Sequence, residues 1–68
     1  MHISIQFLRN HEAVRAVLRK DGWHIQPEEN PDGVRARHPD VQEESVARHR
    51  LNALGLLTSR ICRIEFKR

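Results

Sequence analysis

Cysteine and aromatic residues are scarce in this sequence, which has one cysteine, one tryptophan, two phenylalanines and no tyrosine. The lone Cys62 excludes the intrachain disulfide framework that stabilises many small secreted domains, so a cytoplasmic location is expected. No run approaches the roughly 20 apolar residues that span a bilayer. The alternating residues 1–7 also lack the continuous apolar run of a signal peptide. These absences argue against secreted and membrane-spanning classes, and no membrane partner is expected.

Length limits the chain of 68 residues to one domain, which we expect to cover residues 1–68. A domain of this size buries only about 60% of its unfolded surface, and with so few aromatics its core must consist of Ile, Val, Leu and Ala. Hydrophobic residues make up 38% of the chain and charged residues 31%, which is typical of a globular chain. The small core favours a homodimer or a protein partner that covers further apolar surface.

One pattern occurs twice at an offset of 33 positions. In each copy a leucine precedes a glycine that fits the left-handed position after a helix, and a large apolar residue follows, as in a Schellman ending. Two similar strand–helix units in one domain are therefore predicted. An arginine also recurs, so that the two copies are Arg15, Leu18, Gly22 and Trp23, then Arg48, Leu51, Gly55 and Leu56.

Apolar periodicity predicts the remaining elements. Apolar and polar residues alternate over 2–7, 23–26, 34–38 and 62–67, which indicates four strands. Apolar residues at helical spacing indicate one helix after an Asn10 N-cap and a second that begins with a capping box of Asp40 and Glu43 and runs to about Leu54. The order is βαββαβ. This resembles the ferredoxin-like, split-βαβ arrangement, an α+β fold with two helices on one face of a four-stranded antiparallel sheet.

A winged-helix-like fold is the alternative, because residues 47–58 superficially resemble a recognition helix that runs into a wing. A helix-turn-helix needs another helix just upstream, whereas residues 34–39 alternate like a strand. The ferredoxin-like arrangement is therefore preferred, with its first and third strands in the centre of the sheet and the fourth beside the first.

Strand parity then places a set of polar and charged residues on the sheet face that the helices leave open. Arginine can hold a phosphate through two hydrogen bonds, and the chain has a formal charge of +3. An RNA-recognition motif stacks bases on aromatics of its central strands, and the residues here are polar or basic, so binding should be electrostatic and salt-sensitive. A solvated face whose charge prevents aggregation is the competing interpretation. The candidate nucleic-acid-binding residues are Arg35, Arg37, Arg63, Lys67, Gln6 and His24.

Signatures of metal binding and catalysis are missing from the sequence. The five histidines and Cys62 match no metal-ligand spacing, and there is no phosphate loop or nucleophile elbow. His38 is expected to bind backbone near Pro39, and Cys62 to be a buried core residue. We therefore expect no catalytic residue, metal site or cofactor.

A small non-enzymatic binding or protein-interaction module, able to dimerise through a sheet edge or the open face, is the leading hypothesis. A weakly sequence-selective nucleic-acid-binding domain that uses the basic open face is the first alternative. A small metabolic enzyme is the second.

Overall fold

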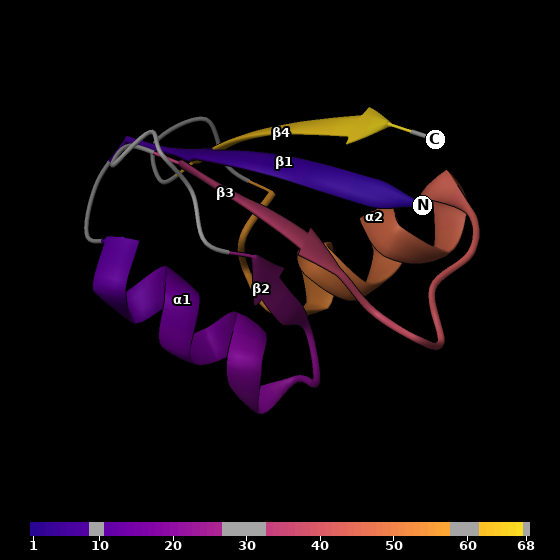
Figure 1. The fold of residues 1–68 in the computed structure, drawn as a ribbon, viewed down its shortest axis with the longest axis horizontal. Helices are drawn as coiled ribbons and strands as arrows, with labels where there is room; N and C mark the ends of the chain where they lie inside the picture. Colours follow the sequence, from indigo (N-terminus) through magenta and orange to yellow (C-terminus); the bar gives the residue numbers. More distant parts are fainter. Residues whose placement is uncertain (9–10, 27–32, 58–61, 68) are drawn as a thin grey trace.

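The computed structural model describes residues 1–8, 11–26, 33–57 and 62–67, which form a four-stranded sheet with both helices on one of its faces (Figure 1). The predicted α+β class and βαββαβ order are confirmed. The chain reaches the second helix from a strand, so the winged-helix-like alternative is wrong. In chain order the elements are β1 (His2–Phe7), α1 (His11–Lys20), β2 (His24–Gln26), β3 (Gly33–Arg37), α2 (Glu44–Ala53) and β4 (Cys62–Lys67).

The sheet has the strand order β2-β3-β1-β4, and every neighbouring pair is antiparallel. The first and third strands therefore lie in the centre, with β4 beside β1, as the preferred βαββαβ arrangement predicted. Ile3 lies opposite both Ala36 and Phe66, and Ile5 lies opposite Val34 and Ile64. These registers give each strand one face toward the helices and one face away from them.

The core lies between the sheet and the helices. Among the described residues, Ile3, Ile5, Leu18 and Leu51 are the largest fully buried side chains, and Trp23 packs with them. Cys62 is buried, as predicted, and its Sγ donates a hydrogen bond to the Leu56 carbonyl oxygen at 3.0 Å. Burial raises the pKa of the Cys62 thiol above its ordinary value of 9.0.

Both helices end in the predicted Schellman geometry. The Trp23 amide donates to the Leu18 carbonyl at 3.0 Å, and the Leu56 amide donates to the Leu51 carbonyl at 3.0 Å. The glycine before each donor has a positive φ, which side chains other than glycine rarely adopt. The repeat in the sequence is therefore a repeated helix ending.

The predicted start of the second helix is wrong. Helix α2 begins at Glu44, and its N-cap, Glu43, makes no side-chain capping hydrogen bond. Asp40 instead donates its backbone N–H to Nδ1 of His38 at 3.0 Å, in a turn that precedes the helix. The Val41 side chain that follows is buried. Packing of this turn onto the core thus overrides the local capping preference, and it is the physical reason for the error.

The buried apolar stripe of α2 is narrow. Ala47 and Leu51 are buried, whereas Leu54 is half-buried and Val46 is 41% exposed. The expected Asn10 cap of α1 lies outside the described residues.

Candidate nucleic-acid interface

The open face of the sheet carries all of the candidate binding residues, and each of their side chains is exposed. On β3, Arg35 lies opposite Ser4 of β1 and Gln26 of β2, and Arg37 lies opposite His24. On the other side of β1, Arg63 lies opposite Gln6, and Lys67 lies opposite His2. The parity argument thus placed the candidate residues on one surface. We call Arg35, Arg37, Arg63 and Lys67 the basic face.

Negative charge is sparse on this surface. Among the described strand residues, Glu65 is the one carboxylate on the open face, where it lies opposite Ser4. Its Oε2 is 3.8 Å from Nζ of Lys67, and both side chains are more than half exposed. Exposed pairs of this kind contribute little to stability. Within the described residues, Arg35, Arg37 and Arg63 form no ion pair, so their guanidinium groups are available to an anion.

Three helix arginines, Arg15, Arg48 and Arg50, differ from those of the basic face because they contact other side chains of the protein. The Arg15 guanidinium lies 5.4 Å from the centre of the Phe7 ring, and that of Arg48 lies 4.8 Å from the Phe66 ring. These are cation–π distances. Arg48 also pairs at 2.8 Å with Glu44, which lies four positions earlier on the same helix. These cations therefore stabilise the helix layer.

Arg50 forms an ion pair that the sequence did not indicate. Its Nε lies 2.8 Å from Oδ2 of Asp21, which also accepts a hydrogen bond from the Trp23 indole at 3.0 Å. The two charged residues are 29 positions apart, and no local pattern relates them. The pair joins the end of α1 to α2 and removes Arg50 from the set of available cations.

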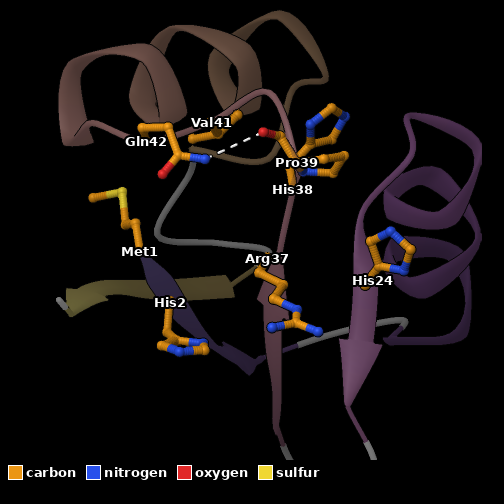
Figure 2. A pocket seen from close by; sticks show the side chains of 8 residues that line it. All are labelled: Met1, His2, His24, Arg37, His38, Pro39, Val41 and Gln42. Carbon is orange, nitrogen blue, oxygen red and sulfur yellow. Dashed lines mark hydrogen bonds between the residues drawn. The ribbon is translucent and has the colours of Figure 1, made fainter.

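A hollow of about 340 Å³ opens at one end of the sheet, where β1 and β2 begin and β3 ends (Figure 2). We call it the turn hollow. A water molecule takes up about 30 Å³ in the liquid, so this hollow has room for a phosphate-sized group. It is lined by Met1, His2, His24, Arg37, His38, Pro39, Val41 and Gln42.

Three side chains of the turn hollow carry groups that an anion can use. Arg37 and His24 are exposed and lie opposite each other. The Nδ1 atom of His2 is buried and has no hydrogen-bond partner among the described residues. Sequence reasoning identified Arg37 and His24. The hollow itself was missed, because residues 38–42 of the following turn form part of its wall.

His38 lines the turn hollow, but its ring nitrogens are already hydrogen-bonded to backbone groups. The Asp40 N–H can only donate, so Nδ1 of His38 accepts and Nε2 carries the proton, which it donates to the Asp21 carbonyl oxygen at 2.8 Å. The ring also lies edge-on to Trp23, with 5.3 Å between centroids. Both ring nitrogens are occupied, and the predicted tie to backbone near Pro39 is confirmed.

Searches outside the chain add no functional information. No protein-family model matches it, and neither does any curated protein or solved structure. Neither described helix is long and apolar enough to cross a membrane. In the described part of the chain, no three His, Cys, Asp or Glu residues are grouped so that they could hold a metal ion. What remains to indicate a function is the geometry of the sheet face.

Proposed function

We propose that the protein is a small, non-enzymatic, cytoplasmic binding module whose basic face binds nucleic acid through its phosphates. The observation that carries this proposal is the availability of the guanidinium groups of Arg35, Arg37 and Arg63 on one face, in contrast to Arg15, Arg48 and Arg50 of the helices, which are engaged by other side chains. Reducing conditions suit a chain with one buried free thiol.

The spacing of the basic face suits an extended polyanion. Arg35 and Arg37 are two residues apart on one strand, which separates their Cα atoms by roughly 6.6 Å. Arg63 and Lys67 lie two strands away from β3, at roughly 10 Å. That separation is close to the Debye length of about 8 Å at physiological salt. Because β1 lies between β3 and β4, a nucleic-acid strand that lies over β1 would have positive charge on both of its sides.

Binding of this kind has little sequence preference. No described open-face residue is Phe, Tyr or Trp, so the large aromatic rings on which an RNA-recognition motif stacks bases are missing, and the imidazoles of His2 and His24 are the aromatic rings among the described open-face residues. Affinity then comes from neutralised phosphates and released counterions, and it falls as salt rises, with a logarithmic slope of about −0.7 for each phosphate of a single strand.

Fluorescence anisotropy with a labelled mixed-sequence single-stranded oligonucleotide, measured over a series of salt concentrations, tests the proposal. The variant Arg35→Ala/Arg37→Ala should weaken binding about tenfold at low salt and reduce the salt slope by about 1.4 units. The matched control is Arg19→Ala/Lys20→Ala, which removes the same charge from the exposed last turn of α1.

The control separates a defined surface from general charge attraction. The proposal expects the control to bind within about twofold of the wild type, apart from the small effect of net charge. Equal losses in both variants, or no binding at low salt, would contradict it and leave the solvated-face interpretation.

A further inference from the structure

Strand β4 forms an edge of the sheet, and its outer side pairs with no other strand of the described residues. It is a six-residue strand, whereas β2 at the opposite edge has three residues. A long unpaired edge offers its backbone N–H and C=O groups to another strand. Beside it, on the helix side, Leu8, Leu57, Ile64 and Phe66 contribute to a hollow of about 320 Å³, and Leu8 is 53% exposed. We call this the β4 hollow.

We propose that two copies of the protein pair antiparallel through β4, about a twofold axis at Ile64. In this register Arg63 lies opposite the partner's Glu65, and Glu65 lies opposite the partner's Arg63. Opposite charges in directly opposed positions stabilise antiparallel strands. On the helix side, Ile64 meets the partner's Ile64 and fills space beside the β4 hollow. The charge pattern of the strand is therefore complementary to itself.

Other registers fit less well. In an antiparallel pair, directly opposed residues have their side chains on the same face. The twofold axis must therefore place one residue opposite its own copy, and it cannot place a residue opposite the next one in the sequence. An axis at Glu65 keeps an equally long overlap, but it places Glu65 opposite the partner's Glu65 and Arg63 opposite the partner's Lys67. An axis at Arg63 or Phe66 pairs a shorter part of Cys62–Lys67. Ile64 is thus the centre that combines long overlap with opposite charges.

The pairing would extend the function of the open face. A twofold axis perpendicular to the sheet keeps both open faces on the same side, so the two basic faces become one surface. The carboxylate of Glu65, the sole negative group there among the described strand residues, would pair with a partner arginine across the junction. Dimerisation itself needs no nucleic acid. A test of the dimer can therefore fail while the proposed nucleic-acid binding holds, and the reverse is also true.

Sedimentation equilibrium of the wild type and three charge variants, in the absence of nucleic acid, tests the proposal. The wild type should show a reversible monomer–dimer equilibrium between micromolar and millimolar concentration. Arg63→Glu and Glu65→Arg should each weaken the dimer about tenfold, because each creates two like-charge contacts. The double variant exchanges the charges and should restore the dimer to within about threefold. All these positions are exposed, so circular dichroism should show the native fold in each variant.

Crosslinking tests the register directly. Oxidation of Ile64→Cys should give a covalent dimer, because opposed Cα atoms of an antiparallel pair are about 4.5–5.5 Å apart, within disulfide range. Glu65→Cys is the matched control for an axis at Glu65, and the wild type controls for the buried Cys62. A monomeric wild type at millimolar concentration, a double variant as weak as the single variants, or crosslinking through Glu65→Cys in preference to Ile64→Cys would overturn the proposal.

Discussion

The side chain of His38 donates from Nε2 to the backbone carbonyl of Asp21 at 2.8 Å, which ties the end of β3 to the turn after α1. Its other nitrogen accepts the Asp40 amide, so one buried imidazole satisfies two backbone groups. Both hydrogen bonds are partly buried, and a backbone group that loses its partner away from water costs about 1–3 kcal/mol. His38 therefore holds together the loops that form one wall of the turn hollow.

Replacing this histidine should destabilise the fold. His38→Leu leaves the Asp21 carbonyl and the Asp40 amide without their partner, and the free energy of unfolding in urea should fall by about 2–4 kcal/mol. His49→Leu is the matched control, because His49 is exposed on α2, and it should change stability by about 0.5 kcal/mol or less. Equal effects of the two variants would show that the His38 hydrogen bonds contribute nothing.

The two glycines of the repeated helix ending should respond differently to the same substitution. Both have a positive φ, of 94° at Gly22 and 75° at Gly55, which costs an alanine about 1–2 kcal/mol. A Cβ at Gly22 would also lie 2.9 Å from Nε2 of His38, whereas a Cβ at Gly55 meets nothing within 4 Å.

Thermal or urea unfolding of the two alanine variants measures this difference. Gly22→Ala should be less stable than Gly55→Ala by about 1–3 kcal/mol, because the clash adds to the backbone strain. Indistinguishable stabilities would mean that His38 moves away freely, in conflict with its two hydrogen bonds.

The sequence predicted the sheet and the residues of its open face, but it did not predict where α2 begins. Strand parity was enough to assign residues to the two faces of the sheet, because Ile3, Ile5 and Ile64 alternate regularly with polar residues. A one-residue shift would expose all three. The same parity brought the candidate residues to one face. The start of α2 was misjudged because burial of Val41 and the hydrogen bond to His38 hold the preceding turn. The hydrogen bond is local, but the burial of Val41 is a tertiary contact, which no local residue pattern encodes.

The thiol of Cys62 should make stability depend on pH at the alkaline end. Burial raises its pKa above 9.0 in the folded protein. Above the pKa of the unfolded chain, the thiol therefore ionises in the unfolded state before it does so in the folded state. The unfolded state then binds fewer protons, and stability falls as pH rises. At pH values below the pKa of the unfolded chain, the contribution of the protonated thiol to stability is fully present.

Urea unfolding at pH 8 and pH 10 measures this effect in the wild type and in Cys62→Ala. The wild type should lose more stability than the variant between the two pH values, since only the wild type carries the thiol. A larger or equal loss in Cys62→Ala would show that other groups account for the pH dependence.

The proposed function requires that nucleic acid bind the open face of the sheet and not the helix layer. Titration of the isotopically labelled protein with a short single-stranded oligonucleotide, followed through its backbone amide NMR signals, tests it most directly. The largest shifts should fall on β1, β3 and β4, around Arg35, Arg37 and Arg63, and they should disappear at high salt. Shifts that are largest on α1 and α2, or no shifts at low salt, would contradict it.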